Sequence, residues 1–258
     1  MRLFDTHTHM DDPLYDEDRE AILASLPAMG VERILICGAN MASSRSSMTL
    51  ADHLTTPAAI AAVGIHPSDA DEVTQENLAI LEGWLSDPKV VALGEIGLDY
   101  YYPNTDRDAQ RAAFQSQLRL ANCLDARVIF HLRDAWGDFF SIMRTHAPRR
   151  GIMHCWSGSK ESAARCLDMG FMISFSGSLT FKNAENLRRV AAFVPTNKLL
   201  VETDCPYLAP VPFRGKRNQP GYVGYTCTCL AECKGLSAEA MAEITYENAC
   251  AFFDLSAV

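Results

Sequence analysis

The sequence predicts an α/β fold, a single (β/α)8 TIM barrel, from its length and from the alternation of two kinds of segment. The chain has 258 residues, and barrels of about 250 residues are common as single units, so we expect one domain over residues 1–258. Short apolar runs alternate with longer stretches of helical character, as in a parallel sheet covered by helices. The eight expected strands are Leu3–His7, Arg33–Cys37, Ala59–Gly64, Val90–Glu95, Arg127–His131, Gly151–His154, Phe171–Ser174 and Leu199–Glu202.

Helical stretches follow these strands, and the last one, Ser237–Phe253, is expected to pack on the barrel as an amphipathic helix. The alternative architecture is an open doubly wound sheet. Such sheets usually have fewer strands and often carry a glycine-rich phosphate loop after the first strand, and no such loop follows Leu3–His7. The other expected helices are Asp16–Met29, Gln75–Ser86, Asp106–Leu124, Ala135–Thr145, Ser159–Met169 and Ala184–Phe193.

The composition is that of a soluble globular protein, and it excludes several other classes. Its apolar runs are short and broken by polar residues, so no stretch of about 20 apolar residues could cross a membrane. The segment Met1–Asp5 has no apolar signal sequence, and we therefore expect a cytoplasmic protein without a membrane partner. No feature of the sequence points to an obligate protein partner.

The formal net charge of −9 limits the kind of nucleic acid complex the chain can form. Proteins that wrap long stretches of nucleic acid usually present a basic surface. A chain with 23 basic and 32 acidic residues is instead expected to hold a few nucleotides at a local site. Acidic side chains also suit a site that binds cations.

The nine cysteines are an odd number, and most lie in apolar segments, so we expect reduced thiols in a reducing compartment. One cluster, Cys227, Cys229 and Cys233, stands apart. Its spacing matches neither a zinc-ribbon pair nor a CxxC redox pair, and we do not expect it to hold a metal.

The strongest functional signal is positional, because six residues with metal-ligating side chains end or follow five of the expected strands. In a TIM barrel, active sites lie at the C-terminal ends of the strands, so these residues are expected to converge on one rim. Imidazole and carboxylate groups suit zinc, manganese and, in part, magnesium. The six expected metal ligands are His7, His9, Glu95, His131, His154 and Asp204.

The local motifs suggest separate roles for these ligands. His7 and His9 are two residues apart on an extended segment, so both rings can reach one ion. Glu95 is flanked by glycines, which let the backbone approach a metal centre closely, and its two oxygens could bridge two ions. Asp204 could bind a metal and accept a proton from an attacking water. Asp204 and Glu95 are therefore the catalytic candidates.

Acidic residues near these ligands are expected to support them. Asp99 and Glu202 are more suited to structural or supporting contacts than to direct ligation. Asp5 either orients a histidine ring or is simply a strand residue. Cys155 follows His154, but no third group is evident that would make it a nucleophile.

Two further residues are candidates for substrate contact. His66 follows the third strand and could touch a phosphate, although a capping or packing role is the alternative. Arg133 shares a strand face with His131, and its guanidinium could hold a phosphate through two parallel hydrogen bonds; an ion pair with an acid is the alternative.

The basic loop 213–220 follows the eighth strand and is either a phosphate site or a solvated surface loop. Tyr100, Tyr101 and Tyr102 could stack on a base or pack at the rim.

Together these motifs, in this order, resemble the TatD family of metal-dependent deoxyribonucleases within the amidohydrolase superfamily. The resemblance covers essentially the whole chain. It implies a TIM barrel with two divalent ions, a contact to phosphate from His66, Arg133 and Arg217, and a shared Glu95. The loop departs from the family's usual Arg-Asn-Glu-Pro at Gln219, which removes one charge. The motifs are Asp5–His9, Gly64–Pro67, Gly94–Asp99, His131–Asp134, His154–Gly158, Glu202–Leu208 and Arg214–Pro220.

The resemblance further implies the pairing of ligands with ions. One ion would be held by His7, His9, Glu95 and Asp204, and the other by Glu95, His131 and His154.

The expected function is metal-dependent hydrolysis of phosphodiester bonds in DNA, as a 3'-5' exonuclease acting on single strands or ends. Two divalent ions, zinc, manganese or magnesium, would activate the attacking water. One alternative is a hydrolase of the same fold for another ester or amide, such as a D-aminoacyl-tRNA or a small phosphoester. A second alternative is a metal-dependent nucleic-acid-binding protein without catalysis.

Overall fold

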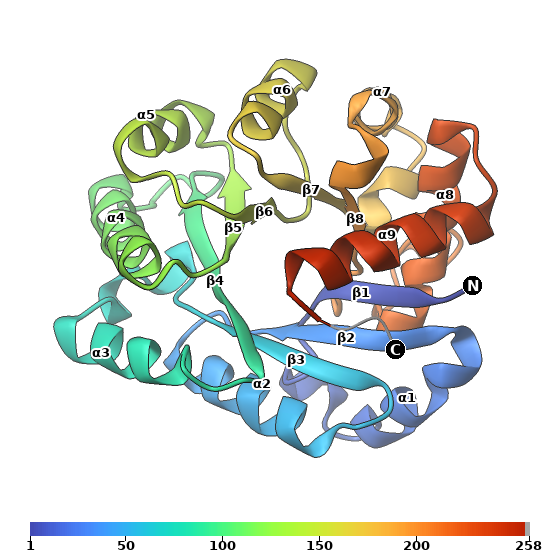
Figure 1. The fold of residues 1–258 in the computed structure, drawn as a ribbon, viewed down its shortest axis with the longest axis horizontal. Helices are drawn as coiled ribbons and strands as arrows, with labels where there is room; N and C mark the ends of the chain where they lie inside the picture. The colour runs from blue at the N-terminus through green and yellow to red at the C-terminus, as the bar shows by residue number, and fades with distance from the viewer. Residues whose placement is uncertain (256–258) are drawn as a thin grey trace.

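The structure, a computed structural model, describes residues 1–255, and within them eight parallel strands form one sheet whose order follows the sequence. A bridge between Thr8 and Cys205 joins the last strand region to the first. The strands thus surround a common interior with the helices outside them (Figure 1), which confirms the predicted TIM barrel. The strands are β1 (Leu3–Thr8), β2 (Val31–Cys37), β3 (Ala58–Val63), β4 (Val90–Asp99), β5 (Val128–Arg133), β6 (Gly151–Met153), β7 (Met172–Phe175) and β8 (Leu199–Val201).

Several of the α-helices begin where a polar side chain satisfies a free backbone N–H group. Asp106, Ser159 and Ser237 each accept a hydrogen bond from the backbone three residues later, so three expected helices begin one residue after their predicted first residue. No helix in residues 1–255 is long and apolar enough to cross a membrane. The α-helices are α1 (Arg19–Ser25), α2 (Met41–His53), α3 (Gln75–Trp84), α4 (Arg107–Leu124), α5 (Trp136–His146), α6 (Lys160–Asp168), α7 (Glu185–Phe193), α8 (Val223–Lys234) and α9 (Ala238–Phe252).

Two apolar layers hold the barrel together. One lies between the strands and the surrounding helices. The other fills the interior with side chains such as Leu35, Ile129 and Leu200, and it continues into Tyr246 and Phe253 at the end of the chain. Helix α9 therefore packs on the barrel as predicted and covers the interior at the end opposite to the C-terminal rim.

The junction of β1 and β8 is fixed by a buried carboxylate. Asp5 accepts hydrogen bonds from the backbone N–H of Thr203 at 2.8 Å and from its hydroxyl at 2.5 Å. The backbone N–H of Asp204 donates to the carbonyl of His7 at 3.0 Å. Asp5 thus bonds to the segment after β8 rather than to a histidine ring, and this segment carries Asp204 to the side of His7.

The fourth strand is longer than predicted, and Glu95 lies within it rather than at its end. The pairing with β5 shifts by one residue between Leu93 and Ile96, so two residues of β4 oppose one residue of β5, as in a β-bulge. Beyond this irregularity β4 continues to pair as far as Asp99 with Arg133. The bulge aims the Glu95 side chain at the barrel axis while the strand goes on.

Gly97 lets β4 lie close to β5 beyond the bulge. Its φ is +157°, and a Cβ placed there would be 1.8 Å from the carbonyl oxygen of His131. The backbone of β5 cannot make room for an atom at that distance unless one of the two strands moves. Gly97 thus permits the close approach of two strands.

We expect Gly97→Ala to lower the free energy of unfolding by about 2–4 kcal/mol, because the added methyl group clashes with the β5 backbone. Urea denaturation followed by circular dichroism measures this change. Gly83→Ala is the matched control, because nothing lies within 4 Å of a Cβ at that helical position, and it should stabilise by about 0.5–1 kcal/mol. Equal stabilities for the two variants would contradict the close approach of β4 and β5.

Candidate metal centre

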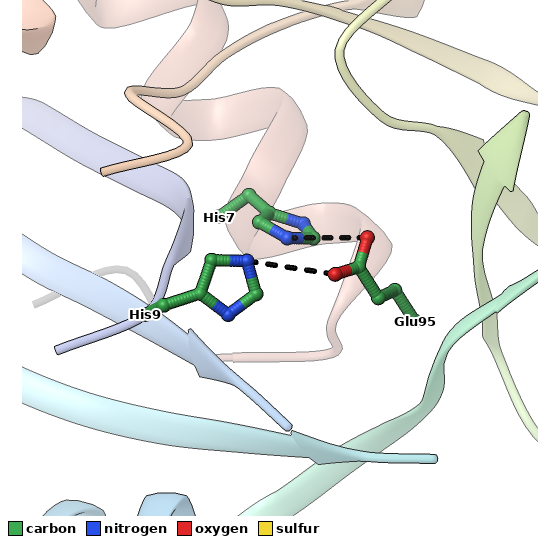
Figure 2. Close-up of side chains that lie close together, drawn as sticks. All are labelled: His7, His9 and Glu95. Atoms are coloured by element: carbon green, nitrogen blue, oxygen red, sulfur yellow. Dashed lines mark ion pairs between the residues drawn. The ribbon is translucent and has the colours of Figure 1, made fainter. Parts of the chain in front are cut away.

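The structure brings all six predicted ligands together at the C-terminal rim of the barrel. The side chains of His7 and His9 come from the end of β1 and both point to the carboxylate of Glu95 (Figure 2). His131 lies in β5, and His154 follows β6 directly. Asp204 stands three residues beyond β8 with a left-handed backbone, φ 57°. The convergence predicted from strand ends is therefore present in the fold.

The first group of ligand atoms surrounds a small space between His7, His9, Glu95 and Asp204. The Nε2 atoms of the two histidines lie 3.8 and 3.5 Å from the oxygens of Glu95. The same nitrogens lie 3.9 and 3.6 Å from Asp204 Oδ1. These separations exceed the roughly 2.7–3.2 Å of a good hydrogen bond. They are close to the roughly 3–4 Å expected between ligands that each lie about 2.0–2.2 Å from one ion.

The second group is a compact triangle. His131 Nδ1 and His154 Nε2 lie 3.3 and 3.0 Å from Glu95 Oε2, and 3.3 Å from each other. A carboxylate oxygen and two ring nitrogens at such distances occupy three corners of a coordination shell. Glu95 belongs to both groups, with Oε1 toward His9 and Oε2 toward this triangle.

Hydrogen bonds outside the centre fix the tautomers of two of these rings. His9 Nδ1 lies 2.8 Å from the carbonyl oxygen of Cys37, and a carbonyl can only accept, so Nδ1 carries the proton. His131 Nε2 lies 3.1 Å from Asp99 Oδ2, and the carboxylate likewise accepts. His9 Nε2 and His131 Nδ1, the atoms that face Glu95, are then the nitrogens left to bind a proton or a metal ion.

The outer ring nitrogen of His154 is held by a carboxylate as well, that of Glu202. Its Nδ1 lies 3.2 Å from Glu202 Oε1, which also accepts from the backbone N–H of Cys155 at 2.6 Å. Cys155 has a φ of 44°, so this second bond holds the sharp turn after β6. With Nδ1 held in this way, His154 presents Nε2 to Glu95 Oε2 at 3.0 Å and to His131 Nδ1 at 3.3 Å, so that a proton or a metal cation can be shared among these three atoms.

Several buried polar atoms of the centre have no hydrogen-bond partner in residues 1–255. They include both ring nitrogens of His7 and Oε2 of Glu95. Leaving such groups unpaired costs about 1–3 kcal/mol each, so buried groups of this kind are normally satisfied. Divalent cations would satisfy His7 Nε2 and Glu95 Oε2, and the donor set of imidazoles and carboxylates suits them.

The electrostatics of the centre also favour cations. Burial acts to raise the pKa of Glu95, but the adjacent His154 and His131 outweigh burial and hold that pKa well below 4.5. Burial, together with His154, lowers the pKa of His7 well below 6.5, which leaves a neutral ring suited to ligation. For His9, burial lowers the pKa, but Asp204 and Glu95 raise it to about 9. The carboxylates therefore attract positive charge to this point.

Of the three predicted substrate contacts, His66 and Arg133 lie near the metal centre and Arg217 lies outside it. The His66 ring lies 4.2 Å from that of His131, and its Nδ1 accepts from the backbone N–H of Ser68, so the Nε2–H is free to donate. The guanidinium of Arg133 lies 3.5 Å over the ring of Tyr101. No ion pair to Arg133 is found in residues 1–255.

Arg217, by contrast, is engaged at the edge of the molecule. Its guanidinium donates to the carbonyl oxygen of Leu14 and to Asp18, and it lies over the ring of Tyr15. In the same loop Asn218 is fully buried and donates to the carbonyls of Thr203 and Tyr207. The loop therefore anchors the turn that carries Asp204, a role that its basic composition did not reveal.

A cleft of about 1130 Å³ opens beside the centre. Of the six ligands, His131, His154 and Asp204 line it, together with Arg133. His7, His9 and Glu95 do not line it. The cleft is large enough for several substrate groups, and a substrate in it would meet Asp204 and the His131–His154 pair first.

Comparison with known proteins places this centre in a family. The family model described as TatD related DNase matches residues 4–254. The uncharacterized metal-dependent hydrolase YabD of Bacillus subtilis is 41% identical over 256 residues, which cover 98% of this chain and 100% of that protein. The chain belongs to the family of TatD-related DNases.

Other TatD-family relatives are similar to the chain over nearly its full length. The crystal structure of YjjV, a TatD homologue from Escherichia coli K12, superposes with a TM-score of 0.92 and covers 99% of both chains at 31% identity. The 3'-5' ssDNA/RNA exonuclease TatD of Citrobacter rodentium is 30% identical over 261 residues and covers 98% of each chain. The TatD-related chain is thus a metal-dependent hydrolase built on a TIM barrel.

We expect Asp99→Ala to weaken metal binding by the TatD-related chain about 10–100-fold, because His131 loses the acceptor that fixes its tautomer. Isothermal titration of the metal-free protein with Zn²⁺ or Mn²⁺ measures this change. Asp138→Ala is the control, because Asp138 pairs with Arg111 and Tyr100 and touches no ligand. Unchanged affinity in Asp99→Ala would contradict the orienting role.

Proposed function

We propose that the chain is a two-metal phosphodiesterase that removes nucleotides from single-stranded DNA or from DNA ends in the 3'-5' direction. The observation that carries this proposal is the carboxylate of Glu95, whose two oxygens belong to two groups of ligand atoms at the side of the cleft. Two adjacent divalent ions are the usual arrangement for displacement at a phosphodiester.

The proposed ligand sets follow from the distances. His7, His9, Glu95 and Asp204 would hold one ion, and Glu95, His131 and His154 the other. When bound, the ions would lower the pKa of water and offset the charge that develops on the phosphate. Zinc, manganese and magnesium are all compatible with these donors.

Asp204 is the proposed general base. It is the carboxylate ligand that lines the cleft, whereas Glu95 does not line the cleft and its side chain is only 6% exposed. A general base must reach the proton that it removes, and Asp204 is within reach of both the ligand group and the cleft. Glu95 is accordingly assigned the bridging role.

His66 and Arg133 are the proposed phosphate contacts. Burial and the adjacent His131 lower the pKa of His66 to about 3, so the ring is neutral near pH 7 and acts through its Nε2–H. Arg133 lies at the cleft wall with its guanidinium against Tyr101, and a guanidinium can bind phosphate with two parallel hydrogen bonds. Arg217 is left out of the set because it does not line the cleft and bonds to Leu14 and Asp18 instead.

The choice of DNA is supported by a relative and by the charge of the chain. The protein of Citrobacter rodentium that is 30% identical carries the name 3'-5' ssDNA/RNA exonuclease. The net charge of −9 disfavours a long duplex and is compatible with a short strand in a local cleft.

The decisive test is cleavage of an end-labelled, single-stranded oligonucleotide by the purified protein with Mg²⁺, Mn²⁺ or Zn²⁺ and with chelator. We expect metal-dependent stepwise shortening from the 3' end. We expect Asp204→Asn to lower the rate by about 10²–10⁴ because the base is lost, while the surface variant Asp52→Asn keeps full activity. A metal-loaded protein that cleaves no oligonucleotide but hydrolyses a small ester or an aminoacyl-tRNA would overturn the choice of DNA.

We expect Arg133→Gln to lower kcat/KM for the oligonucleotide by about 10–100-fold, the cost of losing a hydrogen bond to a charged group. Arg217→Gln should lower it by less than about threefold, because its ion pair is at the surface. Steady-state kinetics on both variants separate the two arginines. A larger loss in Arg217→Gln than in Arg133→Gln would contradict the assignment.

A further inference from the structure

The cleft extends well beyond the metal centre, and the exonuclease proposal leaves that extension without a role. From His131 and Asp204 it runs along the segment after β6 to the groove between α6 and α7. These two helices lie side by side on the outside of the barrel (Figure 1). A mononucleotide at the ions would fill only part of a space of about 1130 Å³.

The far end of the cleft carries two cationic side chains, although the chain has a net negative charge. Lys160, the first residue of α6, and Arg189, on α7, both line it. The ammonium of Lys160 lies 4.7 Å from the ring of Phe193, which draws it toward α7. The two helices thus place both positive groups at one groove.

Arg189 can exchange its present partner for a ligand. It pairs with Glu185 at 2.6 Å, and both side chains are more than 70% exposed. An exposed pair of this kind contributes about 0.2–1 kcal/mol. A phosphate, which an arginine can bind with two hydrogen bonds, competes with such a carboxylate at little cost.

The wall between the ions and these cations is amphipathic. Leu187 offers partly exposed apolar surface, with the buried Trp156 and Val190 also in the wall, while Asn183 and Asn186 are exposed at the same cleft. Apolar surface accommodates the face of a base, and amide groups offer both hydrogen-bond donors and acceptors to its edge. The sequence of groups along the cleft is metal ligands, apolar wall and cations.

We propose that this groove is a second nucleotide subsite, in which Lys160 and Arg189 hold a phosphate of the strand remote from the bond being cut. This inference rests on the proposed phosphodiesterase function and extends it. The remaining strand would pass over α6 and α7 rather than toward the basic loop. That loop is poorly placed for the role, since neither Arg214 nor Arg217 lines the cleft.

The kinetic test compares a substrate with one phosphodiester, thymidine 5'-phosphate p-nitrophenyl ester, with the tetranucleotide of thymidine. In Lys160→Met and Arg189→Gln we expect KM for the tetranucleotide to rise about two- to fivefold each, the size of an exposed charge contact, with kcat unchanged. The one-phosphate ester should be hydrolysed as by the unaltered protein. Lys182→Met and Arg149→Gln are the matched controls, because both side chains are exposed and neither lines the cleft.

Equilibrium binding gives a readout that does not need turnover. Fluorescein-labelled tetrathymidylate is titrated into Asp204→Asn protein, alone and combined with Lys160→Met and Arg189→Gln, at several salt concentrations. Each lost phosphate contact should reduce the slope of log K against log salt by about 0.7. The control substitutions Lys182→Met and Arg149→Gln should leave the slope unchanged.

The outcomes separate the two proposals. Unaltered protein that hydrolyses both substrates, with the cleft variants equal to the controls in KM and in salt slope, would overturn the second subsite and leave the phosphodiesterase. Unaltered protein that hydrolyses neither substrate and does not bind the labelled strand would overturn the phosphodiesterase and the subsite together. Reduced salt slopes confined to the cleft variants would support the subsite.

Discussion

The carboxylate of Glu95 is the contact on which the arrangement of the site depends. It lies within 3.0–3.8 Å of ring nitrogens from His7, His9, His131 and His154. A buried anion among four imidazoles is stable only if positive charge lies between them, because burying an uncompensated charge is costly. The bulge in β4 puts the carboxylate at the barrel axis, and glycines beside it let β4 stay against β5. The fold thus holds the ligands ready for cations.

The acids and carbonyls behind the histidines determine which nitrogen faces the centre. Cys37, Asp99 and Glu202 each accept from the outer nitrogen of one ring. Without them the rings could turn or change tautomer, and the lone pairs would no longer converge. The same buried acids add to the negative charge of the chain. Cations bound at the site would reverse the charge locally, so the acidic composition is compatible with the phosphate substrate that we propose.

Much of this site could be predicted from the sequence because the barrel sorts residues by position. A ligand-type residue at the end of a parallel strand must lie at the common rim, so His7, His131 and Asp204 converge whatever the details of packing. The bulge at Glu95 could not be predicted, because strand register depends on contacts with β5. The burial of Asn218 and the engagement of Arg217 with Asp18 depend on how a long loop folds back. Lys160 and Arg189 carried no signal at all, since charged residues on outer helices usually face solvent.

Anomalous X-ray scattering from crystals grown with Mn²⁺ or Zn²⁺ tests the central claim most directly, because it locates ions without reference to activity. The account predicts two peaks, one on either side of Glu95. One should lie about 2.0–2.2 Å from His9 Nε2, and the other at a similar distance from His131 Nδ1 and His154 Nε2. A single peak that does not contact Glu95, or ions held only by other residues, would contradict the account.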